Sequence, residues 1–443
     1  MRIDLRRGLS IPIPGAPGQT VESARALRSV ALLGDDYPGV RCDLQVEEGD
    51  RVALGQTLFS DRRRPALRFV SPVAGRIAAV HRGEARRLVA VVVEPEGDDH
   101  VELPALGLDA VRGLGREATT ERLLTSGDWV ALRVRPLGAI PDPGSAPAAI
   151  FVRAIDSDPL AADPLPWLHA READLRLGLE ALAQLTDGAI FLCTAPAALP
   201  PLPEQERIRA VQFAGPHPAG LVGTHIHRLC RVGATRRVWY LGVQDLLAIG
   251  AGLRTGRPDP ERVVALAGPG VRRPRLLWTR LGASAEDLVR DELEPGDIRI
   301  VSGSILSGRR AAGPAAFLGR YHEQLCALPV DAAAAPGAWL VPRRGGARRV
   351  PPWRRPPDAG LARLGPGQAM LPLDLFERVV PLRLPIGLLL RALAAGDFDA
   401  AERYGALELE EEDLALCSFL CPSRLEYGAL LRRALREIAV GLA

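Results

Sequence analysis

Two histidines separated by one residue, His225 and His227, are the first candidates for metal chemistry in the sequence. On a β-strand, residues two apart point to the same face, so both imidazoles could bind zinc or iron together with a third ligand. His217 is the nearest candidate for that ligand. No cysteine or carboxylate lies nearby at a spacing typical of metal sites, and we therefore interpret these residues as structural histidines.

Cys417 and Cys421 form a second motif, because the run Cys-Ser-Phe-Leu-Cys-Pro ends in the cysteine-proline pair found in some iron–sulfur sites. An iron–sulfur cluster needs four thiolates in close groups. The remaining cysteines are scattered along the chain: Cys42, Cys193, Cys230 and Cys326. We therefore interpret the pair as structural, and a cluster held by this chain alone is the less favoured alternative.

The other motifs carry little chemistry. The glycine-rich segment 250–256 lacks the Gly-x-Gly-x-x-Gly spacing of nucleotide-binding loops, and a helix end followed by a turn explains it. We interpret the acidic run 408–413 as the solvated start of a helix, where negative charge is favourable. The sequence has no Gly-x-Ser-x-Gly, His-Glu-x-x-His or paired-carboxylate signature, so nothing supports a hydrolase.

The composition excludes several kinds of chemistry. The 443-residue chain has no lysine and no asparagine. It therefore has no lysine for a Schiff base, for a phosphate-binding loop or for attachment of biotin or lipoate, and no site for N-glycosylation. The 56 basic and 53 acidic residues are interspersed and give a formal net charge of +3, so no nucleic-acid partner is indicated.

Any contact with a membrane is expected to be peripheral. Apolar runs such as 88–93 and 386–390 are far shorter than the roughly 20 residues that cross a bilayer. Arginine-rich stretches at 62–64 and 343–355 could contact anionic headgroups or phosphates, although solvated loops are the favoured interpretation. The N-terminus lacks the apolar stretch of a signal peptide, and the scattered cysteines fit the reducing cytoplasm.

The chain is long enough for several domains, and its patterns predict an α/β multidomain protein. In residues 1–104, short strands between glycine turns predict an all-β module with the turn spacing of biotinyl/lipoyl-type barrel sandwiches, but without the carrier lysine. Residues 105–255 alternate strands at 149–152, 188–192 and 238–241 with helices at 117–124, 171–185 and 244–249. This alternation predicts a parallel α/β sheet.

The second half of the chain predicts two further domains. Residues 256–335 combine strands at 263–266 and 298–301 with a helix at 284–292, which predicts a small α+β domain. Residues 336–370 are rich in proline and arginine, which is typical of a linker or surface loop. Residues 371–443 predict a helical domain with helices at 385–395, 397–404 and 425–442. In the last helix, four apolar side chains on one face indicate core packing: Leu430, Leu431, Leu435 and Ile438.

Ordered motifs along the whole chain resemble those of one known family. They lie at 7–13, 31–39, 71–75, 156–164, 215–220, 223–227, 302–308 and 411–417. In these motifs the sequence resembles the A-subunit family of the sodium-translocating NADH:quinone reductase, the NQR complex. It departs from that family in the 340–360 region and at Ser423-Arg424, where Gly-Lys is usual.

The resemblance implies a fold similar to that of the flavin- and NADH-binding subunit of respiratory complex I. That fold comprises a barrel-sandwich module, a Rossmann-like α/β domain, a small ubiquitin-like domain of the SLBB type and a helical domain. The resemblance also implies that this chain binds no cofactor tightly and that flavins and iron–sulfur centres lie on other subunits. The residues agree, because the segment 131–137 lacks the glycine that would let a flavin phosphate approach closely. A subunit that itself carries flavin or iron–sulfur centres is the alternative, and it would need more cysteines.

The resemblance further implies a peripheral subunit on the cytoplasmic face of the bacterial inner membrane, within a six-subunit complex. That complex reduces ubiquinone to ubiquinol and exports sodium, while the isolated subunit is not expected to be catalytic. A part in binding ubiquinone is also implied. The candidate residues lie in two segments that combine apolar surface, a turn and a polar donor: Leu33, Gly34, Tyr37, Pro38 and Gly39, then Arg133, Arg135 and Pro136. Ordinary domain-interface loops are the alternative interpretation.

Overall fold

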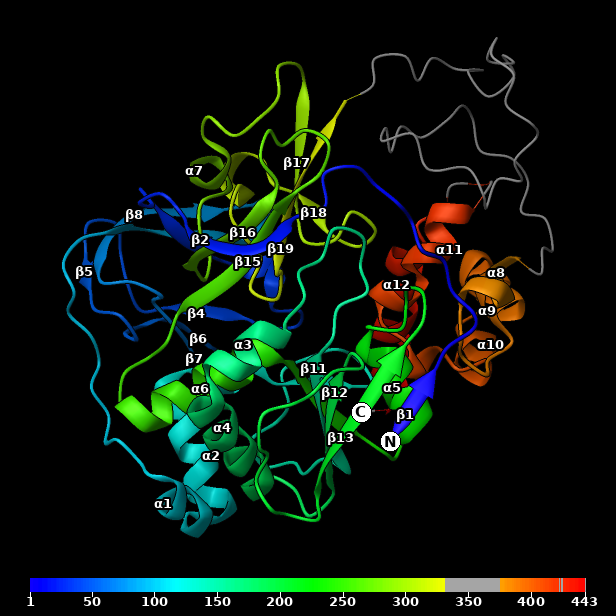
Figure 1. The fold of residues 1–443 in the computed structure, drawn as a ribbon, viewed down its shortest axis with the longest axis horizontal. Coiled ribbons are helices and arrows are strands. Elements are labelled where there is room, and N and C mark those ends of the chain that lie inside the picture. Colours follow the sequence, from blue (N-terminus) through cyan, green and yellow to red (C-terminus); the bar gives the residue numbers. More distant parts are fainter. Residues whose placement is uncertain (331–374, 422, 424, 443) are drawn as a thin grey trace.

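The computed structural model describes residues 1–330, 375–421, 423 and 425–442. Its described strands form two six-stranded sheets, one four-stranded sheet and one three-stranded sheet. Helices pack on one of the large sheets, and the helices from the C-terminal part of the sequence form a separate group beside it (Figure 1). The predicted α/β multidomain fold is therefore confirmed.

The sheet of the α/β domain has the order β1-β13-β12-β11-β14-β10. Its strands are β1 (Arg2–Asp4), β10 (Arg133–Arg135), β11 (Ala149–Ala154), β12 (Ala189–Thr194), β13 (Ile208–Ala214) and β14 (Val238–Gly242). Neighbouring strands run parallel except at the edge, where β10 is antiparallel to β14. This arrangement confirms the predicted parallel α/β sheet.

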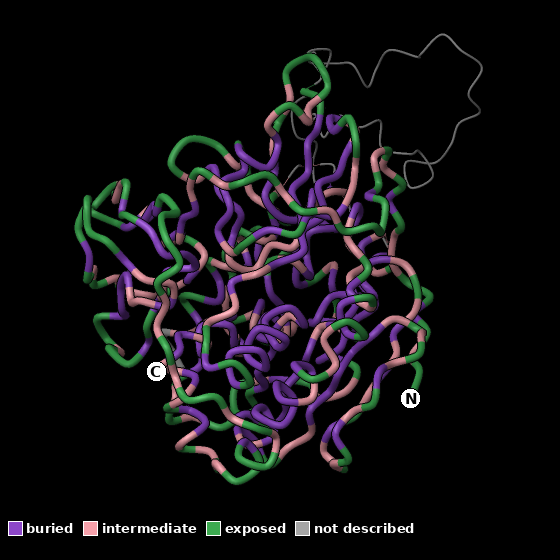
Figure 2. Tube along the Cα trace, turned by 60° about the vertical axis from the view of Figure 1, so that its left-hand side comes forward, coloured by how far each residue is buried: buried purple, intermediate pink, exposed green. Residues whose placement is uncertain are grey.

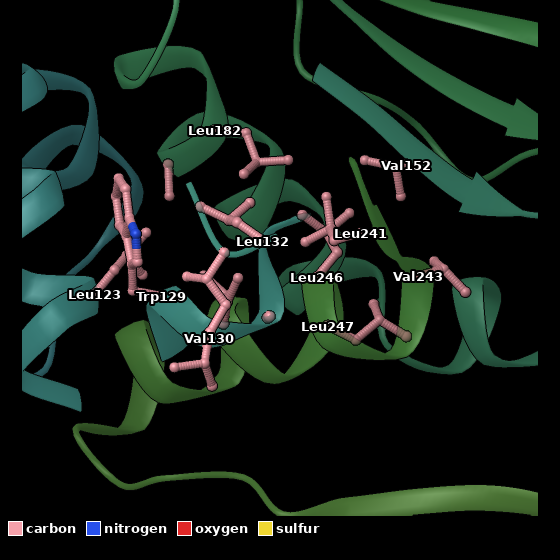
Figure 3. Packing of buried hydrophobic residues seen from close by; sticks show 14 of the residues in the cluster. Leu123, Trp129, Val130, Leu132, Val152, Leu182, Leu241, Val243, Leu246 and Leu247 are labelled. Carbon is pink, nitrogen blue, oxygen red and sulfur yellow. The ribbon is translucent and has the colours of Figure 1, made fainter. Parts of the chain in front are cut away.

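The helices of this domain cover both faces of the sheet. They are α1 (Leu108–Gly113), α2 (Gly115–Ser126), α3 (Leu165–Ala170), α4 (Glu172–Gln184), α5 (Val222–Leu229) and α6 (Val243–Thr255), with a 3-10 turn η3 at Asp128–Ala131. Val152 of β11 packs in one apolar layer with Leu182 of α4 and Leu246 of α6 (Figure 3). Its neighbour Phe151 packs in the other layer with Ile226 of α5. Because both faces are covered, the central strands β11, β12 and β14 are largely apolar runs.

Helices α4 and α6 approach closely because each has a glycine at the contact. A Cβ atom on Gly178 of α4 would lie 2.6 Å from the backbone oxygen of Leu246, and one on Gly250 of α6 would lie 1.9 Å from the backbone oxygen of Asp174. The interpretation of segment 250–256 as a helix end and turn was therefore wrong for most of its length. Helix α6 continues to Thr255, and Gly256 ends it in the left-handed conformation with a φ of 75°.

The β module consists of the sheets β3-β9-β8-β5 and β4-β6-β7. Its strands are β3 (Val30–Leu33), β4 (Cys42–Leu44), β5 (Arg51–Val52), β6 (Thr57–Asp61), β7 (Arg64–Val70), β8 (Gly75–Arg82) and β9 (Leu88–Pro95), with 3-10 turns η1 (Gly34–Asp36) and η2 (Glu84–Arg86). The rings of Phe59 and Phe69 stack in its core with centroids 4.5 Å apart. Arg62 and Arg63 form the exposed turn between β6 and β7, as predicted for a solvated loop.

The small α+β domain contributes the second six-stranded sheet, in the order β18-β17-β19-β15-β16-β2. Its elements are β2 (Gly18–Ser23), β15 (Glu261–Ala267), β16 (Arg275–Arg280), α7 (Ala285–Val289), β17 (Ile298–Ser302), β18 (Arg309–Arg310), η4 (Gly313–Ala315) and β19 (Gln324–Pro329). Helix α7 begins after Ser284, whose hydroxyl accepts a hydrogen bond from the Asp287 N–H. The predicted α+β character of this region is confirmed.

The first residues of the chain do not stay within the β module. Strand β1 pairs with β13, and β2 pairs with β16. Between them, Ile11 packs into the core of the C-terminal helices. Figure 1 shows this blue segment passing from β1 along the C-terminal helices to β2. The N-terminal segment thus joins three parts of the molecule, which the pattern of short strands did not indicate, and the predicted domain boundaries stay predictions.

The C-terminal helical domain has its own apolar core. Its elements are α8 (Leu375–Val379), α9 (Ile386–Ala395), α10 (Phe398–Arg403), η6 (Ala406–Glu408), η7 (Glu411–Leu414), α11 (Ala415–Leu420) and α12 (Tyr427–Leu442). The apolar face predicted for the last helix is confirmed, because Leu431, Leu435 and Ile438 are buried and Leu430, which is partly buried, packs against the same core. Pro385 precedes α9 instead of occupying its first turn. The predicted linker 336–370, with the arginine-rich stretch 343–355, lies outside the described residues.

Burial follows this division of the molecule. Figure 2 shows buried stretches running through the interior, whereas exposed residues are concentrated in the loops at the periphery. The cores of the α/β domain and the β module are continuous, because one apolar cluster includes Phe69 of β7 and Trp129 of η3. This continuity fixes the β module against the α/β domain, and it places the loop after β3 beside the carboxyl ends of the central strands.

Candidate functional site

A cavity of about 1390 Å³ lies where four parts of the chain meet. The β module contributes residues 34–42 and 85–88, the α+β domain contributes 320–324, and the C-terminal helical domain contributes 410–412. The α/β domain contributes the carboxyl ends of β11 and β14, through residues such as Arg153 and Gly242. These strands are adjacent, although the chain leads from β11 to β12 on its other side. Ligands of open α/β sheets bind at such a switch point.

The loop after β3 forms one wall of the cavity. Gly34 begins this loop, and a Cβ atom at this position would lie 2.2 Å from the backbone oxygen of Leu88, so only glycine fits. The Tyr37 ring packs edge-on against Phe69 at 4.5 Å and against Tyr321 at 6.4 Å between centroids. Pro38 and Gly39 complete the turn. This wall is therefore aromatic and held in one conformation by the core of the β module.

Arg133 supplies a polar donor to the same cavity. Its guanidinium carbon lies 5.2 Å from the ring centroid of Tyr240 and 5.0 Å from that of Tyr321. Among the described residues it has no ion-pair partner, and Nε donates a hydrogen bond to the Gly138 carbonyl at 3.3 Å. Among the described residues, the buried Tyr240 hydroxyl has no hydrogen-bond partner. Burial raises the pKa of Tyr321 to about 12, so its hydroxyl stays neutral.

The structure brings together five of the eight residues predicted to bind quinone. Those that line the cavity are Gly34, Tyr37, Pro38, Gly39 and Arg133. The others are buried elsewhere: Leu33 packs in an apolar cluster with Phe317, Pro136 is enclosed, and Arg135 pairs with carboxylates of the C-terminal domain. The role of all eight in binding quinone stays a prediction.

Charged residues that were not among the predicted candidates also line the cavity. Arg153 at the end of β11 donates to Asp156 at 2.7 Å and to Glu323 at 2.8 Å. Asp245 in the first turn of α6 accepts from Arg262 at 2.7 Å and from Arg320 at 2.8 Å. Apart from Asp156, these partners lie 17 to 170 residues away in the sequence. The one local signal was the run of acids at 156–158 after an apolar strand.

The acidic run 408–413 belongs to this site and is not the solvated helix start that we predicted. It forms the 3-10 turns η6 and η7, in which Glu410 and Asp413 are buried. Glu410 accepts a hydrogen bond from Arg432 of α12 at 2.6 Å. The run is acidic because it neutralises buried arginines, which the sequence alone could not distinguish from a solvated face.

The paired histidines lie on helix α5 and not on a strand. Residues two apart on a helix point about 200° apart, so His225 and His227 cannot face a common ion. His225 Nε2 lies 2.9 Å from the Ala219 carbonyl. The Arg383 N–H donates to His227 Nε2 at 2.9 Å, which leaves Nδ1 to donate to Glu408 at 2.8 Å. Both therefore have structural partners, as the sequence analysis favoured.

The cysteine pair is buried in the C-terminal helical core. Cys417 lies on α11 with a side chain shielded from solvent, and burial raises the pKa of its thiol. Cys421 Sγ lies 3.3 Å from the Tyr427 hydroxyl. Both are free thiols. Within the described ranges, no group of three or more His, Cys, Asp or Glu side chains could hold a metal ion.

Among the helices that the structure describes, none is long and apolar enough to cross a membrane. Three family models match the chain: the NqrA N-terminal barrel-sandwich hybrid domain at 3–96, the NqrA second alpha/beta domain at 114–258 and the NQRA C-terminal domain at 263–313. A chain of an NAD+-reducing [NiFe]-hydrogenase has 16% sequence identity and a TM-score of 0.34, covering 51% of this chain and 49% of that one.

Curated relatives match over nearly the whole length. The NqrA protein of the Na(+)-translocating NADH-quinone reductase of Klebsiella pneumoniae (strain 342) is 44% identical over 98% of this chain and 99% of its own. The corresponding proteins from Pseudomonas aeruginosa (strain UCBPP-PA14) and Hahella chejuensis are 44% and 41% identical, with the same coverage. The chain therefore belongs to NqrA, the A-subunit family of the Na(+)-translocating NADH-quinone reductase.

Proposed function

We propose that this chain works as a peripheral subunit of a Na(+)-translocating NADH-quinone reductase and supports the reduction of ubiquinone to ubiquinol coupled to sodium export. The observation that carries this proposal is the 44% identity to the Klebsiella protein over 98% of the chain. We further propose that the chain lies on the cytoplasmic face of a six-subunit membrane complex. In this proposal the flavins and iron–sulfur centres belong to the other subunits, and the isolated chain is not catalytic.

Within that assembly, the cavity is our proposed contact with ubiquinone. A quinone ring is flat and neutral and carries two carbonyl acceptors, so its site needs aromatic walls and a few donors. Tyr37 and Tyr321 offer aromatic surface to the cavity. Arg133 offers a guanidinium donor that no described carboxylate occupies. Because this donor is partly buried and poorly solvated, a hydrogen bond from it to a quinone carbonyl would be stronger than one at an open surface.

Photoaffinity labelling of the intact complex tests this proposal. A photoreactive ubiquinone analogue should label peptides of this chain that contain residues 34–39 or Arg133, and unlabelled ubiquinone should compete. The substitution Arg133→Met should weaken quinone binding by about 10- to 100-fold, since a hydrogen bond to a charged donor is lost. Arg299→Met, at an exposed position on β17, is the matched control and should bind normally. Labelling confined to other subunits would refute the proposed contact.

A further inference from the structure

The carboxylates that line the cavity are neutralised by arginine, with one exception. The pairs are Asp35 with Arg87, Asp36 with Arg309, Asp156 and Glu323 with Arg153, Asp245 with Arg262 and Arg320, Glu410 and Glu411 with Arg432, and Glu412 with Arg135. Asp158 also lines the cavity, but no arginine of the described residues lies within 4.0 Å of its carboxyl group. An acid in this position lacks the adjacent positive charge that favours ionisation of the other carboxyl groups.

The contacts of Asp158 fix one of its two oxygens. The Ser304 hydroxyl donates to Oδ1 at 2.7 Å, and the Asp158 backbone N–H donates to Asp156 Oδ1 at 2.8 Å, which holds the loop. For Oδ2, the described residues provide no hydrogen-bond partner. The side chain is 13% exposed, and this exposure faces the cavity that it lines. One oxygen is therefore anchored and the other is available to a ligand.

His217 does not replace the missing arginine. Its Nδ1 lies 3.8 Å from Asp158 Oδ1, beyond hydrogen-bond distance, and 3.1 Å from the Ser157 hydroxyl. Because the Gly220 N–H donates to the Ser157 oxygen at 2.7 Å, the hydroxyl proton is free to donate to His217 Nδ1. Burial lowers the pKa of His217 to about 4, so the ring is neutral at pH 7.

Several charged or titratable groups surround Asp158: Arg153 and Asp156 from the end of β11, His217 from the loop after β13, Ser304 after β17, Cys326 on β19 and Glu412 on η7. Burial, together with a smaller contribution from the charge of Asp156, raises the pKa of Asp158 to about 8. The Ser304 hydrogen bond and Arg153 lower it by less. The carboxyl group is therefore protonated at pH 7, which agrees with its lack of a cationic partner.

We propose that protonated Asp158 donates a hydrogen bond from Oδ2 to a carbonyl oxygen of the quinone ring, with Ser304 positioning the carboxyl group. This inference rests on the proposed quinone contact and names a second donor that lines the same cavity as Arg133. A protonated acid suits a neutral acceptor, since an ionised carboxylate would repel a carbonyl oxygen.

Quinone affinity measured against pH tests the assignment. In the intact complex, the dissociation constant of a short-chain ubiquinone analogue is measured from pH 6.5 to 9.5 by competition with the photoreactive analogue. Wild-type affinity should fall above about pH 8, by about tenfold per pH unit while the neutral form is depleted. Asp158→Asn keeps a donor that does not ionise, so its affinity should not change with pH. Asp158→Ala should bind about 2- to 10-fold more weakly than wild type at pH 7.

Two measurements separate this inference from the proposed function. Asp109→Asn, on the exposed side of α1, is the matched control and should keep the wild-type pH profile. Infrared difference spectra without quinone should show a carboxylic acid C=O band at pH 7 that Asp158→Asn removes. Absence of that band, or a wild-type pH profile in Asp158→Asn, would overturn the assignment of Asp158. If wild type binds no quinone in this chain although the band is present, the proposed quinone contact fails and not the protonation of Asp158.

Discussion

The Arg135 guanidinium is shielded from solvent, and carboxylates of the C-terminal helical domain neutralise it. It donates to Asp413 at 2.6 Å and to Glu412 at 3.1 Å. Burial raises the pKa of Asp413, whereas the Arg135 charge lowers it. Without the guanidinium, the carboxylates of Glu412 and Asp413 would lose their shared cation. Asp413 is buried, so water could not replace that cation there. Removing one member of a buried pair is more harmful than never having the pair.

Arg135→Ala should therefore destabilise the chain by about 3–5 kcal/mol. The thermal unfolding midpoint of the purified chain measures this change. Arg25→Ala is the matched control, because the Arg25–Asp291 pair is 52% and 71% exposed and should contribute little. If both substitutions lowered the thermal unfolding midpoint by the same amount, burial would not be the reason that the Arg135 contacts are strong.

The candidate residues of the cavity illustrate what a sequence alone can reveal. Gly34, Tyr37 and Arg133 entered the analysis through resemblance to a family, supported by apolar surface and a turn. Asp158 was visible only as part of a motif. Asp158 is distinctive because it has no arginine as an ion-pair partner among the described residues. That property depends on the tertiary positions of the arginines on β11, in the α+β domain and on α12, which pair with other carboxylates. No local pattern encodes that property.

The packing of α4 on α6 depends on glycine positions that local propensity would discourage. Gly250→Ala should destabilise the chain by about 1–3 kcal/mol, because the new methyl group would lie 1.9 Å from the Asp174 backbone oxygen and force the helices apart. Gly252→Ala, one half-turn along the same helix, meets no atom closer than 3.6 Å and should stabilise by about 0.5–1 kcal/mol. Urea unfolding of both variants checks this. Destabilisation of equal size would contradict the assigned contact.

Elements with strong patterns were predictable, and short ones were not. Strands β11, β12 and β14 are largely apolar runs, since both faces of the sheet are covered, and α4 has an amphipathic pattern long enough to identify. Strands β1 and β2 lie at the edges of sheets formed by distant parts of the chain, and β1 has only three residues. The segment around His225 is too short for its period to decide between strand and helix. Tertiary partners determined each of these outcomes.

The cavity exists only because four parts of the chain dock against one another. The C-terminal helical domain is held to the α/β domain through Arg135 and through α5, where Arg228 donates to the Pro381 carbonyl at 3.0 Å. The N-terminal segment adds Ile11 to the C-terminal core. Changes far from the cavity lining should therefore alter the site if they loosen the contacts between these parts.

Glu408 of the C-terminal helical domain binds two basic residues of the α/β domain across this interface. It accepts hydrogen bonds from His227 at 2.8 Å and from Arg231 at 2.6 Å. Burial alone would raise the pKa of Glu408, but the hydrogen bonds from these two residues outweigh it and hold the pKa below its usual value. A carboxyl group with a lowered pKa stabilises the fold above its unfolded-state pKa of about 4.3, and this contribution is lost as the pH falls through the folded-state value.

Glu408→Gln should therefore unfold at a lower temperature than wild type at pH 7, and the difference should narrow as the pH falls below about 4. The narrowing follows because acid removes the same charge from wild type that the substitution removes at every pH. Thermal midpoints measured from pH 7 to pH 3 check this, with the exposed Glu286→Gln on α7 as the matched control. A constant gap between Glu408→Gln and wild type across this range would mean that the ionised form of Glu408 does not hold the two domains together.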